Sequence, residues 1–355
     1  MSAIFPKRLE AMKENKKVQH NLDLSGKTIV NARLVNCRAE GGIEGVTPGS
    51  GGDSAETVYI DVHAYMIYEE EEPFTLESDY DGCSGTITIK GFTRDFKTLE
   101  EQIIPFEIPE GKSRISIPVE LNLGDTVACV AKIPGKGASC QFVRKVVPHT
   151  SVDLEVFPAG LYEINSDGIH PLGGVFLFGE DHAGLAIVTN DFAFAWPAKQ
   201  RSNWLTEPIR WSGSDQNIPI QGIYEAQQAR TDYDGALNTA AAKAVINEQS
   251  AAFNVGAIVE DSKLKEFFLP SLGMLDYLRT NKAAINEFIS SAESELDDEF
   301  SKIDDSMVEC WWSSTIHSDP SYGWAISMED GRYPSDDHRG FLNIVAAVCN
   351  FVKEL

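Results

Sequence analysis

The stretch that decides the fold is Cys310-Trp-Trp-Ser-Ser-Thr315, followed by Tyr322-Gly-Trp-Ala-Ile-Ser327 and the pair Asp330-Gly331. This order is typical of a β-meander: large aromatic residues, an alternating segment, an Asp-Gly turn and a last apolar run over 341–352. A frayed chain end does not carry this much apolar surface. We therefore expect Trp312 and Trp324 to lie in a packed core.

Working back from this meander, the sequence predicts two helices and a hairpin. Residues 236–248 are rich in alanine, and residues 272–289 place leucine, isoleucine and phenylalanine at helical spacing. Ser271 after Pro270 is the expected N-cap of the second helix. The runs 175–178 and 184–188 favour a β-hairpin. This order of elements predicts an α+β domain over 151–355.

Residues 57–150 have the pattern of an all-β domain. Apolar and polar residues alternate over 58–68, 85–90, 103–108, 113–121, 126–133 and 140–147. Turn sequences such as Asp81-Gly82, Pro109-Glu-Gly111 and Pro134-Gly135 separate these runs. Strands at this spacing predict an Ig-like β-sandwich.

The N-terminal part differs in composition from the rest. Residues 1–38 contain eight basic and three acidic residues, a net charge of +5, whereas the whole chain carries −24. Residues 39–56 are rich in glycine and serine, as in a flexible linker. We expect 1–38 to be an anchoring arm that docks on an acidic surface, although an ordinary solvated segment would show the same charges. The acidic body argues against bulk nucleic-acid binding.

Several classes of site and segment are not indicated. The first residues lack the apolar core of a signal peptide, and no run of 18 apolar residues predicts a membrane span. We therefore expect synthesis in a cytoplasm without export by the general secretory route. The six cysteines form no Cys-x-x-Cys pair, so a zinc site is not indicated. We expect no other metal and no cofactor. Whether Cys310 and Cys349, which flank the meander, form a disulfide is left open.

Two elements together carry a family resemblance. These elements are Leu269-Pro-Ser-Leu-Gly273 and Trp312-Ser-Ser-Thr315, in this order and spacing. Two further runs add to the resemblance, Gly174-Val-Phe-Leu-Phe178 and Asp234-Gly235. Residues of about 160–352 thus resemble the C-type-lectin-like domains of bacterial surface and fimbrial-type proteins and of phage receptor-binding or fibre proteins. The resemblance implies a compact fold with adjacent termini and a binding face of long loops. The Glu-Pro-Asn and Gln-Pro-Asp triplets of calcium-dependent sugar binding do not occur.

The candidate ligand-binding residues lie in two polar loops that one strand joins, 316–322 and 332–339. Both loops mix aromatic, acidic and basic residues, a composition suited to adaptable recognition. The competing interpretation is that they are ordinary solvent loops. The predicted ligand-binding set is Tyr322, Arg332, Tyr333, Asp336, Asp337 and His338.

These features predict a non-enzymatic phage virion protein, either a head fibre or a tail-associated adhesin. In this hypothesis 1–38 binds capsid or tail proteins, the chain forms a homotrimer, and the tip meets a host-surface glycan or protein. The alternatives are a bacterial surface-type adhesin and a cysteine oxygenase similar to the formylglycine-generating enzymes. Only Cys310 and Cys349 could be the catalytic cysteines of such an oxygenase, and the sequence shows no His–Cys or Ser–His–Asp set beside them.

Overall fold

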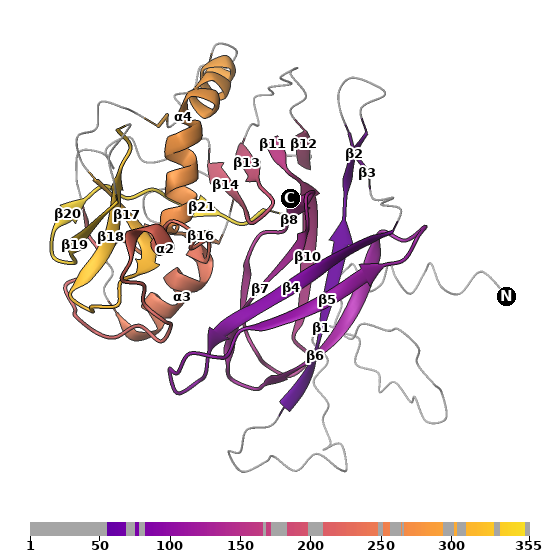
Figure 1. The fold of residues 1–355 in the computed structure, drawn as a ribbon, viewed down its shortest axis with the longest axis horizontal. Coiled ribbons are helices and arrows are strands. Elements are labelled where there is room, and N and C mark those ends of the chain that lie inside the picture. The colour runs from indigo at the N-terminus through magenta and orange to yellow at the C-terminus, as the bar shows by residue number, and fades with distance from the viewer. Residues whose placement is uncertain are drawn as a thin grey trace, which may run out of the picture. The chain divides into compact units, whose positions relative to one another are not determined.

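The computed structural model describes residues 55–68, 75–77, 82–165, 168–171, 183–197, 209–247, 251–255, 264, 266–293, 302–303, 310–329 and 334–351. The described residues all belong to one compact unit, 53–355. The expected arm and nearly all of the expected linker lie outside the described residues. The last two linker positions, Ala55 and Glu56, instead begin the first strand, β1 (Ala55–Ala64). The unit is mostly β-sheet (Figure 1).

A large sheet forms from the residues in which alternation predicted strands. Besides β1 it contains β4 (Cys83–Phe92), β5 (Gln102–Ile108), β6 (Arg114–Asn122), β7 (Thr126–Ile133), β8 (Gly137–Ala138), β9 (Phe142–Lys145) and β10 (Ser151–Pro158). Its order is β5-β4-β7-β8-β10-β1-β6, with β9 paired to β7. The outer strands β5 and β6 contact each other, so the sheet folds over its own apolar face.

The core of this part is built from the inward positions of alternating strands. Val58, Ile60 and Val62 of β1 are fully buried and pack with Ile87 of β4 and Leu154 of β10. Period-two burial along β1 and β4 is what one buried face of a sheet requires. β10 lies beyond the expected domain boundary at residue 150, yet it pairs in parallel with β1.

The predicted turns reverse the chain as their glycines suggest. Gly111 and Gly135 both have φ +70°, and a Cβ at either position would meet no atom within 4 Å. Because the left-handed conformation disfavours residues with a Cβ, backbone geometry and not crowding accounts for glycine here.

The second sheet follows directly from β10. It runs β12-β11-β13-β14-β21-β16 and consists of β11 (Gly160–Asn165), β12 (Gly168–Pro171), β13 (Gly184–Val188), β14 (Ala193–Pro197), β16 (Phe267–Phe268) and β21 (Val348–Cys349). The expected strand at 175–178 lies outside the described residues. β13 pairs with β11 and β14. Of the apolar run predicted as one final strand, only β20 (Leu342–Asn343) and β21 are strands.

The predicted helices are confirmed, with shifted ends. The alanine-rich helix is α3 (Gly235–Val245), preceded by the short α2 (Ala226–Ala229), and the second helix is α4 (Leu272–Glu293). α4 packs against β17 (Cys310–Ile316) and β18 (Tyr322–Ser327), which with β19 (Ser335–His338) form the meander (Figure 1). A further short pair joins β20 to β15 (Ile209–Arg210), and β2 (Met66–Tyr68) pairs with β3 (Thr75–Glu77).

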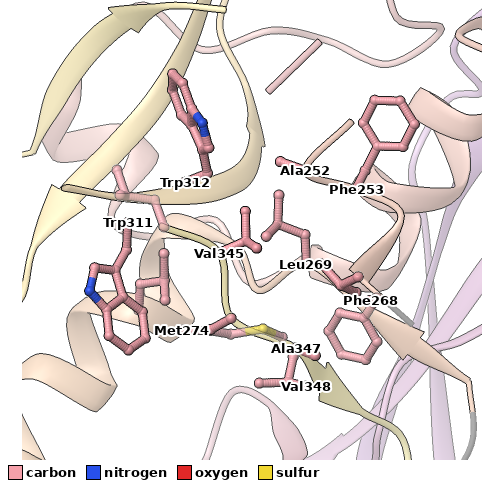
Figure 2. Close-up of a cluster of buried hydrophobic side chains, with 14 of the residues drawn as sticks. Ala252, Phe253, Phe268, Leu269, Met274, Trp311, Trp312, Val345, Ala347 and Val348 are labelled. Atoms are coloured by element: carbon pink, nitrogen blue, oxygen red, sulfur yellow. The ribbon is translucent and has the colours of Figure 1, made fainter. Parts of the chain in front are cut away.

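The tryptophans of the meander are core residues, as predicted. Trp311 and Trp312 are fully buried and Trp324 is 3% exposed. Successive residues of a strand point to opposite faces, and Figure 2 shows the indole rings of Trp311 and Trp312 on opposite sides of β17. Trp311 stacks on Trp196 of β14, with ring centroids 6.3 Å apart.

Three indole groups also bind backbone carbonyls of distant segments. Trp312 Nε1 donates to the carbonyl of Ile209 at 2.8 Å, and Trp324 Nε1 donates to that of Ile223 at 3.1 Å. Trp211 Nε1 donates in the opposite direction, to the carbonyl of Ser313 at 2.8 Å. The segment 209–223 has few backbone ladder bonds of its own, so these bonds fix its course over the meander.

The two elements that carry the family resemblance are bonded to each other. Thr315 Oγ1 accepts a hydrogen bond from the Leu272 N–H at 2.8 Å, and the Ser314 N–H donates to the Pro270 carbonyl at 2.9 Å. Ser271 occupies the predicted N-cap position, because its carbonyl accepts a hydrogen bond from the Leu275 N–H at 3.0 Å. Its buried Oγ atom, however, has no hydrogen-bond partner in the described structure, so it makes no side-chain cap. The first N–H of α4 is satisfied from β17 instead.

We predict that Thr315→Val lowers the free energy of unfolding by about 1–3 kcal/mol, because it leaves a buried N–H of α4 without an acceptor. The measurement is urea unfolding of both proteins. Thr57→Val is the matched control, since the Thr57 hydroxyl binds Glu120 in an exposed position and its loss should cost less than about 0.5 kcal/mol. Equal effects of the two changes would contradict the role assigned to Thr315.

Candidate ligand-binding surface

The antiparallel pairing of β18 with β19 positions most of the predicted ligand-binding residues. Tyr322 lies opposite His338, and Trp324 lies opposite Asp336. The expected loop at 332–339 is thus partly wrong, because residues 335–338 form a strand. Arg332 and Tyr333 lie outside the described residues.

Alternation divides the predicted set between two faces of the meander. Tyr322, Asp336 and His338 share the face of Trp324, whereas Asp337 pairs with Gly323 on the opposite face. There the Asp337 carboxylate accepts a hydrogen bond from Asn343 Nδ2 at 2.8 Å. The structure therefore brings three predicted residues together and separates Asp337 from them.

The shared face carries a continuous series of rings, which we call the ring row: Tyr224, His317, Tyr322, His338 and Phe341. Successive ring centroids lie 5.8, 5.7, 6.0 and 5.9 Å apart. The end members are strongly exposed, Tyr224 at 70% and Phe341 at 59%. Large exposed aromatic side chains that cluster in this way mark interaction surfaces.

The middle of the ring row rests on buried groups. His317 is 4% exposed and lies 5.2 Å from the ring of Trp324, whose N–H holds the carbonyl of Ile223. The Asp319 N–H donates to His317 Nδ1 at 3.0 Å, which fixes the imidazole. Because its base is rigid, the ring row loses little side-chain entropy when a ligand binds.

A buried cation lies beneath the ring row. Arg339 is 1% exposed, and its guanidinium lies 4.4 Å from the ring centre of Trp211. Arg339 Nε donates to the carbonyl of Tyr322 at 3.1 Å, and Nη1 donates to that of Gln216 at 3.0 Å. Burial lowers the pKa of Arg339 to about 10. The guanidinium is therefore charged at neutral pH and joins the meander to residues 214–216.

Carboxylates border the same face. Asp336 is exposed beside Trp324 in the pairing of the strands. The Ser321 N–H donates to Asp319 Oδ1 at 2.9 Å and, as the main cause, lowers the pKa of that carboxyl. A ligand could stack on the ring faces of this surface. It could also donate hydrogen bonds to the phenol, imidazole and carboxylate groups.

The two cysteines considered for the enzyme alternative form no disulfide with each other. Cys349 is fully buried, and burial raises its pKa well above the usual range. Cys310 is partly buried. Since the thiolate is the reactive form, Cys349 is poorly suited to act as a nucleophile or metal ligand. Within the described ranges, no group of three His, Cys, Asp or Glu residues could hold a metal ion.

The sequence did not reveal three residues that build this site, two of them exposed and one buried. Tyr224 is almost a hundred residues from the meander in the chain, and no local pattern marked it. Phe341 was taken as the start of a buried strand, yet it is exposed, and Arg339 was taken as the end of a solvent loop, yet it is buried. A buried arginine next to a tryptophan is recognisable only once the two segments are known to meet.

No family model matches the chain, and no curated protein matches it. Among solved structures, the chain is similar to a fimbrial protein from Bacteroides ovatus ATCC 8483. The identity is 12%, the match covers 84% of this chain and 71% of that chain, and the TM-score is 0.36. A likeness at this level establishes neither a shared fold nor a shared function. No helix in the described ranges is long and apolar enough to span a membrane.

We predict that Arg339→Lys lowers the free energy of unfolding by about 2 kcal/mol, because an ammonium keeps the charge but cannot reproduce the two carbonyl bonds and the stacking on Trp211. Thermal unfolding followed by circular dichroism is the measurement. Arg114→Lys is the control, since Arg114 makes an exposed ion pair with Asp61 that is worth little. A stability loss no larger than that of the control would show that the buried guanidinium is dispensable.

Proposed function

We propose that this chain is a non-enzymatic recognition protein of the adhesin type, which binds its target through the ring row. The observation that carries this proposal is the row itself, with exposed Tyr224 and Phe341 at the ends of a rigid, partly buried series of rings. Rigid aromatic side chains supply contact area at low entropic cost, which is why recognition surfaces use them.

The finer class of the domains belongs to this proposal. We assign the C-terminal part to the C-type-lectin-like class and residues 57–150 to the Ig-like class. The hydrogen bonds between Leu272 and Thr315 and between Ser314 and Pro270 support the first assignment, because they join the two elements on which the resemblance rests. The folded-over sheet around Val58 and Ile87 supports the second.

The proposal also includes an anchor and a carrier. Residues 1–38, with their net charge of +5, attach the protein to a larger assembly, and the assembly carries several copies, three in the simplest fibre. A phage particle, through its capsid or tail proteins, is the carrier we test first, and a bacterial surface structure is the alternative. Immunogold electron microscopy decides between them, by labelling either purified particles or the cell envelope.

Adsorption of the fluorescently labelled protein to a panel of bacterial strains and epithelial cells tests the recognition function. We expect saturable adsorption to at least one cell type. The triple variant Tyr224→Ala, Tyr322→Ala, His338→Ala should reduce this adsorption by about tenfold or more, since aromatic anchors dominate binding energies.

Tyr59→Ala is the matched control, because Tyr59 is 54% exposed but lies on β1, away from the meander. Its adsorption should equal that of the unchanged protein. Circular dichroism verifies that the triple variant is folded. A folded triple variant that adsorbs normally, or a protein that adsorbs to no cell type, would refute the proposed use of the ring row.

A further inference from the structure

A cavity of about 460 Å³ lies where the large sheet meets the segment that leads to α3. Its walls come from the end of β4 with the residues that follow, from residues 220–223, and from α2, α3 and β17. The volume falls in the range of sites for small molecules. The proposed recognition function makes no use of this cavity.

The cavity and the ring row meet at one backbone pairing, in which Ile223 bridges to His317. The Ile223 N–H donates to the Ile316 carbonyl at 2.8 Å, and both side chains line the cavity. The next residue of each segment, Tyr224 and His317, belongs to the ring row. No member of the ring row lines the cavity, so the two sites use different residues.

One wall of the cavity is a fixed set of charged groups from distant segments. Lys90 Nζ lies 2.6 Å from Asp234 Oδ2 and 3.8 Å from Glu101 Oε2. The other oxygen of Asp234 accepts a hydrogen bond from Gln141 Nε2 at 2.8 Å. Asp232 is held from behind, by the Asp234 N–H at 2.9 Å and by Asn238 Nδ2 at 2.8 Å. These groups are therefore positioned before any ligand arrives.

Much of the remaining lining is apolar. The apolar residues are Leu99, Ile220, Ile223, Leu237 and Ile316. A site with one hydrocarbon wall and a few fixed polar groups favours a ligand that is itself partly hydrocarbon and partly polar. A fully polar molecule would leave the apolar residues without contacts, and a fully apolar one would leave the charged groups without partners.

The charges specify the sign of the polar part. The lining contains four acidic residues, Glu100, Glu101, Asp232 and Asp234, and one basic residue, Lys90. Burial raises the pKa of Asp232, so the negative charge of the site rests mainly on the other three. Burial alone would lower the pKa of Lys90, but Asp234, Glu101 and Asp232 together outweigh burial and raise the pKa. Lys90 thus remains an ammonium group, and its position shows that an ammonium fits beside Asp234 and Glu101.

We infer that this cavity binds a small aliphatic amine, whose ammonium group lies beside the carboxylates of Glu101 and Asp234 and whose hydrocarbon part lies on the isoleucine and leucine wall. Lys90 competes with the ligand for these carboxylates. Its removal should therefore strengthen binding, whereas a Lys90 that served the fold alone would have no such effect on an added amine.

Isothermal titration of the full chain with cadaverine, an aliphatic diamine, tests this site. Glu101→Gln should weaken binding by about tenfold, and Lys90→Met should strengthen it by a similar factor, because the charge near the ammonium changes in opposite directions. The corresponding uncharged diol should bind to none of these proteins. Glu101 is half-exposed, so its change leaves the fold intact even if Lys90→Met destabilises it.

Lys132→Met is the matched control. Lys132 has a similar exposure to Lys90, 30% against 35%, and pairs with Asp191 outside the cavity lining. Its cadaverine affinity should equal that of the unchanged protein. Absence of cadaverine binding, equal binding of the diol, or an affinity insensitive to Glu101→Gln would overturn the inference. The proposed recognition function would stand in each case, because its adsorption measurement does not involve the cavity.

Discussion

Three indole N–H groups fix the course of the segment 209–223, and both candidate sites depend on it. Trp312 and Trp324 hold its two ends by the carbonyls of Ile209 and Ile223, while Trp211 reaches from the segment to the carbonyl of Ser313. A segment with few ladder bonds would otherwise leave polar backbone groups unpaired against the core. The tryptophans therefore bury apolar surface and satisfy backbone acceptors at the same time.

The same segment forms the junction between the two proposed sites. Ile223 lines the cavity, the next residue, Tyr224, belongs to the ring row, and the Ile223 N–H donates to the Ile316 carbonyl. A displacement of this segment would change both surfaces together. Arg339 adds a second support from below, by its bonds to the carbonyls of Gln216 and Tyr322. Recognition and amine binding would thus share one structural foundation, although they share no ligand-contacting side chain.

The sequence predicted those features that local patterns encode. Alternation located β1, β4, β5, β6 and β7, helical spacing located α4, and the size of Trp312 and Trp324 predicted their burial. The parallel pairing of β1 with β10 could not be predicted, because its register joins Tyr59 to Ser151 and no local pattern encodes a partner so far along the chain. Ser271 shows a similar limit: it stands at the predicted N-cap position, but the hydroxyl that accepts a bond from the first N–H of α4 belongs to Thr315 of β17.

The candidate site was predictable only in part, for the same reason. Loop composition pointed to Tyr322, Asp336 and His338, and the strand register places these three on one face. The register also places Asp337 on the other face. A loop has no regular alternation of side chains, so treating 332–339 as a loop could not predict this division. Tyr224 joins the ring row, and Lys90 joins Asp234, through tertiary contacts alone.

The most direct test of the central claim removes the indole N–H groups and keeps their shape. Benzothienylalanine, in which sulfur replaces the indole nitrogen, would be placed at positions 312 and 324, and amide hydrogen exchange would be measured along the chain. Loss of the bonds to Ile209 and Ile223 should accelerate exchange of the Ser212 and Ile223 amides by about tenfold, while the amide of Ile60 in β1 exchanges as before. Unchanged exchange at Ser212 and Ile223 would contradict the claim that these hydrogen bonds hold the segment in place.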